Sequence, residues 1–88
     1  MTTEAEKKAE AALQEALATD PNSTDAQMRL AVLYMHGGRL DEANWAFTKV
    51  LALDPGNARA LANLGTVLQA LGRNTEAEAR YEEAIAAD

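Results

Sequence analysis

The sequence repeats itself every 34 residues, and this period limits the folds that the chain can adopt. When the 88-residue sequence is shifted by 34 positions against itself, nine identical pairs align without a gap. They are Asp20/Asp54, Pro21/Pro55, Ala26/Ala60, Leu30/Leu64, Gly38/Gly72, Arg39/Arg73, Glu42/Glu76, Ala43/Ala77 and Ala52/Ala86. Chance would give about two or three in so alanine-rich a chain, so stacked copies of one small motif are expected rather than a single central core.

Each unit contains two stretches with the apolar spacing of an amphipathic helix. The first stretch follows the i, i+3, i+4, i+7 pattern, with Leu30 and Tyr34 on its apolar face. The second places Ala43 and Phe47 on one face in the same way. Aromatic residues make up only 5% of the chain, which also favours helices over a sheet. Each unit is therefore predicted to be a helix pair.

Glycine, proline and asparagine mark the predicted helix ends. Gly38 and Gly72 stand where the first helix of a pair must end in a left-handed residue. Asp54-Pro55 ends a second helix, because a residue before proline avoids the α region. Asn22 and Asn57 are predicted as the N-caps of the helices that follow.

These signals predict an all-α fold, a right-handed superhelical solenoid of antiparallel helix pairs that forms a single domain over residues 1–88. The helix preceding the first full pair matches the second half of a unit, because Ala9 and Leu13 align with Ala43 and Phe47. Residues 4–19 are thus expected to be a half repeat, followed by repeats at 24–57 and 58–88, the last truncated before its next boundary. The five expected helices are 4–19, 23–36, 40–53, 57–71 and 74–87.

Small residues recur where the two helices of a pair must approach closely. Ala31 aligns with Gly65, and Ala43 aligns with Ala77. A larger side chain at these positions would push the helices apart. The aromatic residue at position 47 or 81 is expected to fill the space beside them.

This pattern resembles the tetratricopeptide repeat, a helical family with a period of 34 residues. The residues that carry the resemblance are Gln27, Leu30, Ala31, Tyr34, Ala43, Phe47 and Pro55, and then Leu61, Leu64, Gly65, Leu68, Ala77 and Tyr81. They depart from the family pattern at its Trp position in both units, at its Gly in the first and at its Tyr in the second. The resemblance implies a protein-interaction module whose concave face, built from the first helix of each pair, holds an extended or helical peptide.

The concave face is predicted from the positions that point away from the partner helix of each pair. In the first unit we expect Met28 and Met35 to be exposed there, as an adaptable apolar surface or as packing for the neighbouring helix. Arg29 could pair with Asp25 at i, i+4 spacing instead of meeting a partner. The full set of candidates is Asp25, Met28, Arg29, Val32, Met35, His36, Arg59, Ala62, Asn63, Thr66, Gln69 and Ala70.

Two further interpretations concern Asn63 and Trp45. Asn63 matches one position of the clamp with which some family members hold chaperone C-termini, but Met28 and Val32 replace the Lys and Asn of that clamp. Such a clamp is therefore not expected. Trp45 is predicted on the convex side, either as a partner contact or lying flat on aliphatic stems.

Composition argues against several classes of function. The net charge is −6 without a basic cluster, which disfavours nucleic acid and anionic membranes as partners. The chain has one His and no Cys, and its carboxylate pairs are adjacent in sequence, so no enzyme, metal or cofactor site is expected. The longest apolar run, residues 30–35, is too short to span a membrane, and without an apolar signal core a cytoplasmic location is expected.

The ends of the predicted solenoid leave alternatives open. Residues 4–19 lack a pairing helix, and residues 74–87 lack a capping helix. The chain could be a docking or spacer segment of a larger protein or enzyme, or it could self-associate through these terminal helices.

Overall fold

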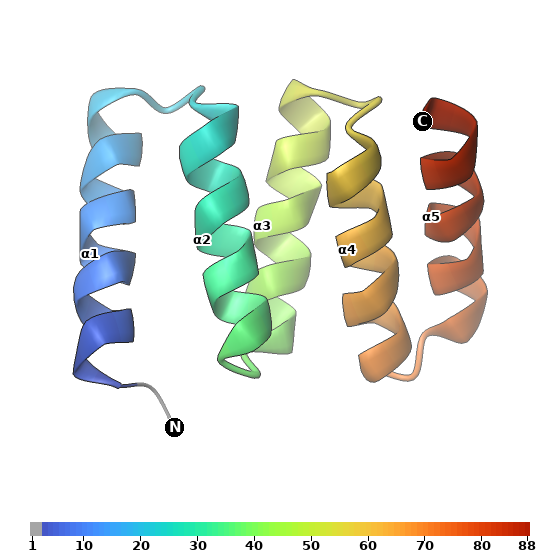
Figure 1. Cartoon of the computed structure of the whole chain (residues 1–88), viewed down its shortest axis with the longest axis horizontal. Helices are drawn as coiled ribbons and strands as arrows, with labels where there is room; N and C mark the ends of the chain where they lie inside the picture. The colour runs from blue at the N-terminus through green and yellow to red at the C-terminus, as the bar shows by residue number, and fades with distance from the viewer. Residues whose placement is uncertain (1–2) are drawn as a thin grey trace.

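The structure, a computed structural model, describes residues 3–88, which form five antiparallel helices in a row (Figure 1). Successive helices lie side by side in chain order, so that each contacts its neighbours in sequence. The molecule measures 34 × 28 × 16 Å along its principal axes. This arrangement confirms the predicted all-α solenoid of helix pairs. The helices are α1 (Glu4–Thr19), α2 (Thr24–His36), α3 (Leu40–Leu53), α4 (Ala58–Ala70) and α5 (Asn74–Ala87).

Two equivalent polar residues cap α2 and α4, which shifts the predicted helix starts by one residue. The backbone N–H of Ala26 donates to Ser23 Oγ at 3.2 Å, and that of Ala60 donates to Asn57 Oδ1 at 2.9 Å. The prediction of Asn57 as an N-cap is confirmed, whereas that of Asn22 is wrong. Ser23 lies 34 residues before Asn57, so the repeat places the same cap in both units.

Two glycines end α2 and α4 in the left-handed conformation that the sequence predicted. Gly38 has a φ of 74° and Gly72 a φ of 81°. The residue after each glycine donates its backbone N–H into the last helical turn, from Arg39 to the oxygen of Tyr34 at 2.9 Å and from Arg73 to that of Leu68 at 2.8 Å. These bonds turn the chain back so that α3 and α5 run antiparallel to the preceding helices.

The core lies within the helix pairs, where the predicted close approaches occur. Ala43 and Phe47 of α3 are 0% exposed. A Cβ added at Gly65 of α4 would stand 2.7 Å from Cε1 of Tyr81 in α5, which is closer than real carbon atoms approach. Glycine at position 65 therefore lets the Tyr81 ring lie directly against the α4 backbone.

α1 contains no fully buried residue, and a polar network attaches it to the rest of the chain. Glu10 pairs with Arg39 at 2.5 Å and accepts a hydrogen bond from the hydroxyl of Tyr34 at 3.2 Å. Arg39 also pairs with Glu42, and its guanidinium carbon lies 4.5 Å from the centroid of the Tyr34 ring. The hydrogen bonds that Arg39 donates to Glu42 and Glu10 raise the pKa of Arg39. Leu13 and Leu17 add apolar contacts between α1 and the core.

Candidate partner-binding groove

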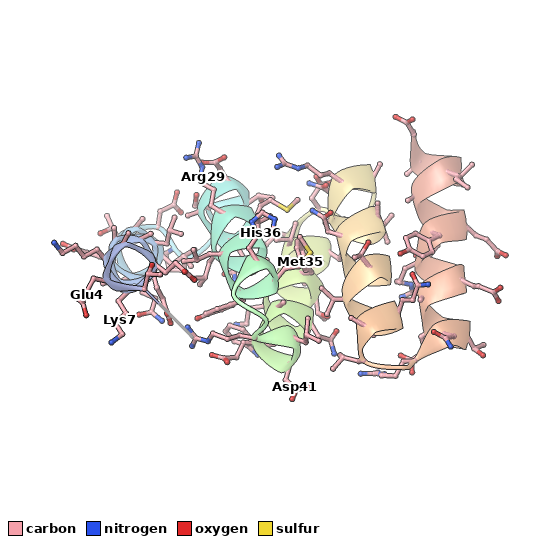
Figure 2. All side chains as sticks on the ribbon, turned by 60° about the horizontal axis from the view of Figure 1, so that its bottom comes forward. Glu4, Lys7, Arg29, Met35, His36 and Asp41 are labelled. Carbon is pink, nitrogen blue, oxygen red and sulfur yellow. The ribbon has the colours of Figure 1, made fainter. Side chains whose placement is uncertain are left out.

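A hollow of about 350 Å³ lies between α2 and α4, the first helices of the two predicted repeats. Asp25, Met28, Arg29 and Val32 line it from α2, and Arg59 lines it from α4. We call these five residues the groove. All five belong to the predicted concave set, because successive first helices lie side by side once the pairs stack. In Figure 2, Arg29 and Asp41 stand at opposite edges of the molecule, on α2 and α3.

The apolar part of the groove is less exposed than the sequence predicted. Met28 is only 8% exposed and belongs to the core cluster, so the expectation of an exposed Met28 is wrong. Its alternative reading, packing against neighbouring helices, is correct. Val32 and Met35 are half-buried and pack against the same core. The apolar surface available to a partner is therefore centred on Val32 rather than on a pair of methionines.

The charged part of the groove contains one paired and one unpaired arginine. Arg29 Nε lies 3.0 Å from Asp25 Oδ2, which confirms the i, i+4 pair expected from the sequence. Both side chains are largely exposed, so this pair contributes about 0–1 kcal/mol to stability. Arg59 is exposed and forms no ion pair with any residue in the described range 3–88. Arg59 is thus the groove cation available to an incoming carboxylate.

Several candidates of the second unit do not line the groove. Thr66 Oγ1 lies 3.2 Å from the hydroxyl of Tyr81, and that hydroxyl donates to Gln69 Oε1 at 3.2 Å. The side chains of Thr66 and Gln69 therefore contact α5 instead of α2. Ala62 and Asn63 are half-buried on α4, and Ala70 is exposed near its end. None of these residues lines the groove, although Ala62 and Arg59 together line a second hollow on the α5 side of α4.

His36 and Trp45 also lie outside the groove. His36 is exposed in the last turn of α2 and lines a different hollow. Trp45 on α3 is 55% exposed, with Lys49 Nζ 4.5 Å from its ring centroid. The exposure expected of Trp45 is confirmed, and its ring contacts the cation of its own helix. A contact between Trp45 and a partner stays a prediction.

Sequence reasoning missed the hollow that His36 lines, which lies between α1 and α2. Its volume is about 440 Å³, and its walls include Ala9, Ala12 and Leu13 from α1. The signal for it was present in the repeat, because these positions align with Ala43, Ala46 and Phe47.

The described residues contain neither a metal-binding arrangement nor a membrane-spanning segment. Within residues 3–88, no three His, Cys, Asp or Glu side chains gather to hold an ion. None of the five helices there combines the length and apolar character needed to cross a bilayer.

Comparison with known sequences identifies relatives of this chain. A family model described as Tetratricopeptide repeat matches residues 4–44 and again residues 46–88. Type IV pilus assembly protein PilF of Pseudomonas aeruginosa is 38% identical over 78 residues, covering 89% of this chain and 31% of that protein. Cellulose synthase operon protein C of Pseudomonas fluorescens is 36% identical over 67 residues, covering 76% of this chain and 5% of that protein. The chain spans less than a third of either relative.

Solved structures share the fold closely. MamA superposes with a TM-score of 0.91 at 28% identity, covering 96% of this chain and 49% of that chain. YrrB, described as a TPR protein with an unusual peptide-binding site, superposes with a TM-score of 0.87 at 30% identity. That match covers 94% of this chain and 43% of YrrB.

Proposed function

This chain belongs to the tetratricopeptide repeat family, and from that membership we propose that it is a protein-interaction module that binds a peptide of a partner in its groove. The observation that carries the proposal is the hollow between α2 and α4, where Val32 provides apolar surface beside the unpaired cation of Arg59. The description of YrrB as having a peptide-binding site supports the same class of ligand.

The chemistry of the groove suits a short peptide that presents one apolar and one acidic side chain. The apolar side chain would rest on Val32, and the carboxylate would pair with Arg59. Because the groove is shallow and the contact small, we expect affinity in the range of about 1 μM or weaker.

A second candidate function is a docking segment of a larger assembly. The names of two relatives refer to pilus assembly and to a cellulose synthase operon, and the chain spans only a part of each. In that case the groove would bind a component of the same assembly.

A pull-down with charge-reversed variants tests the groove. Arg59→Glu removes the unpaired cation while leaving the core untouched, because Arg59 is exposed. Lys49→Glu is the matched control, since it makes the same charge change at an exposed position of α3, beside Trp45. We expect Arg59→Glu to lose partners that the wild type and Lys49→Glu retain.

Two outcomes contradict this assignment. Identical partner sets for all three proteins would exclude the groove, and loss with Lys49→Glu alone would move the site to the surface around Trp45. Met28→Glu is unsuitable for this test, because a charge at this buried position would destabilise the fold itself.

A further inference from the structure

Because the units repeat, the exposure of a residue can be compared with that of its equivalents 34 and 68 positions away. Positions 43 and 77 are equivalent, and their alanines are 0% and 2% exposed. The third equivalent, Ala9 on α1, is exposed. The same residue type at the same position of the motif is thus buried twice and open once.

The neighbouring positions show the same difference. Ala46, Phe47 and Val50 of α3 are all completely buried, whereas their α1 equivalents Ala12 and Ala16 are exposed and Leu13 is half-buried. The contrast extends to the adjoining helix. Val67 of α4 is completely buried, but its equivalent on α2, Leu33, is only half-buried. We call Ala9, Ala12, Leu13, Ala16 and Leu33 the α1 socket; its three alanines are exposed and its two leucines half-buried.

The α1 socket is a concave surface rather than a flat strip. A hollow of about 440 Å³ runs between α1 and α2, with Ala9, Ala12 and Leu13 on one wall and Val32 and Leu33 on the other. Arg29 and His36 stand at its rim. A helix placed there would therefore contact two helices, as each internal helix of the stack does.

The other two units show what covers such a face. α2 packs on α3, and α4 packs on α5; these are the two most extensive helix contacts in the molecule. Each covering helix buries large apolar residues on either side of one small residue. They are Leu30, Ala31 and Tyr34 in α2, and Leu64, Gly65 and Leu68 in α4. In α4 the small residue, Gly65, lets the Tyr81 ring approach the helix backbone.

We infer that the α1 socket binds an amphipathic helix of a partner protein, which packs antiparallel on α1 with apolar residues at i, i+3, i+4 and i+7 and a small residue among them. The bound helix would take the place that α2 occupies on α3. This surface is distinct from the groove, although Arg29 and Val32 border both.

The opposite end of the stack carries polar substitutions that α1 lacks. Tyr81 replaces Phe47, and its hydroxyl bonds with Gln69 and Thr66, which replace Met35 and Val32. These changes suit a surface that faces water, even though Ile85 is 78% exposed there. The α1 socket consists of alanine and leucine alone, and Leu13 stands there at the position equivalent to Tyr81.

A second copy of this chain is a poorer occupant than a separate helix. The two helices of matching pattern are α2 and α4, and their apolar faces are already buried inside the stack, with Leu30 and Leu64 only 2% and 4% exposed. A copy could present them only by unfolding. The occupant is therefore a helix that is not already packed in a pair.

Binding of a defined peptide tests the inference on the full chain. The probe is a fluorescein-labelled peptide of residues 57–73 of this sequence, which carries Leu61, Leu64, Gly65 and Leu68. Fluorescence anisotropy measures its affinity for the wild type and for Ala9→Glu and Ala11→Glu. Ala9 and Ala11 are both exposed on α1, but two residues along a helix place Ala11 on the opposite side. Neither variant disturbs the core, and melting curves check that both remain folded.

We expect Ala9→Glu to weaken binding at least tenfold and Ala11→Glu to leave it unchanged. Arg59→Glu should also leave it unchanged, which separates the α1 socket from the groove. As a second measurement, residues 58–72 are fused ahead of Ala5, which preserves the 34-residue spacing. The fused helix should raise the Tm and abolish binding of the free peptide.

Three results would overturn the inference. The first is equal loss of binding in Ala9→Glu and Ala11→Glu. The second is no binding of the peptide together with no rise in Tm for the fused protein. The third is a wild-type dimer in sedimentation equilibrium that Ala9→Glu dissociates, because the occupant would then be a second copy.

Discussion

At the scale of single residues, Gly65 shows how one missing side chain determines the distance between two helices. The Tyr81 ring lies where a Cβ at position 65 would stand, and its hydroxyl reaches Thr66 and Gln69. In the first unit the equivalent residues are Ala31 and Phe47, which are both 0% exposed and belong to the same core cluster. The close approach is a property of the repeat, and the choice of glycine is a local response to the tyrosine ring.

Gly65→Ala should destabilise the chain by about 1–3 kcal/mol, because the added methyl group forces the Tyr81 ring and α5 outward. Urea denaturation measures the change. Gly56→Ala is the control, since nothing lies within 4 Å of a Cβ there and its backbone is not left-handed. Equal stability of the two variants would show that the 65–81 contact is not tight.

At the scale of helices, α1 differs from the other four in the kind of contact that attaches it to the rest of the molecule. The other helices each bury at least two residues, whereas α1 buries none and relies on the Glu10–Arg39–Tyr34 network. The hydrogen bond from Arg39 holds the pKa of Glu10 below its usual value of 4.5. A carboxylate whose pKa is lowered by folding stabilises the folded state above its unfolded pKa, and this contribution is lost as the pH falls through the folded pKa.

Docking of α1 should therefore weaken below about pH 4.5 in the wild type, and less so in Glu10→Gln. At pH 7 Glu10→Gln should cost about 1 kcal/mol, since the ion pair is only partly exposed and Arg39 donates two hydrogen bonds to Glu10. Hydrogen exchange of the α1 amides at pH 7 and at lower pH measures the docking. Glu15→Gln is the control, because it removes a carboxylate from an exposed position of the same helix that forms no ion pair within the described residues 3–88. An unchanged pH dependence in Glu10→Gln would exclude Glu10 as the titrating group.

At the scale of the whole molecule, stability is carried by contacts between neighbouring helices along a line. α4 with α5 and α2 with α3 form the extensive contacts, and α1 with α2 forms the smallest contact between consecutive helices. Each pair is therefore a unit, and α1 is an addition to the first. The division into a half repeat at 4–19 and repeats at 24–57 and 58–88 stays a prediction, and these unequal contacts lead to a test of it.

Removal of residues 1–20 should leave residues 21–88 folded, with a modest loss of stability. Removal of residues 74–88 should be much more damaging, because it exposes Leu64 and Leu68 of α4, which are 4% and 3% exposed in the intact chain. Circular dichroism melting of the two truncated proteins measures the difference. If both truncations cost the same, α1 is not a half repeat but an equal member of the stack.

Much of the fold could be predicted because its signals are local. A 34-residue spacing, glycines that tolerate a positive φ and a proline after an aspartate act on the few residues around them. Three of the ten predicted helix ends differ from the structure, each by one residue. The misassigned cap, Asn22 instead of Ser23, reflects two adjacent residues that can both accept the same kind of bond. The repeat itself favours Ser23, through its alignment with Asn57.

The site was less predictable because burial depends on which helices lie alongside. A helical wheel places Met28 on the outer face, but packing of the stack buries it, and Thr66 and Gln69 turn to a hydroxyl on the next helix. A helical wheel describes one helix and does not show which neighbouring helices cover its faces.

The sequence by itself determined the number of helices, their pairing and the family, because periodicity and helix-end chemistry act over one or two turns. Only the tertiary structure decided which of the equivalent faces are covered. Ala9, Ala43 and Ala77 are the same residue at the same position, and their exposure differs because α3 and α5 each have a helix packed on that face and α1 has none. The bond between Glu10 and Arg39 likewise joins residues 29 positions apart, which only the stacking of α1 on α2 brings together.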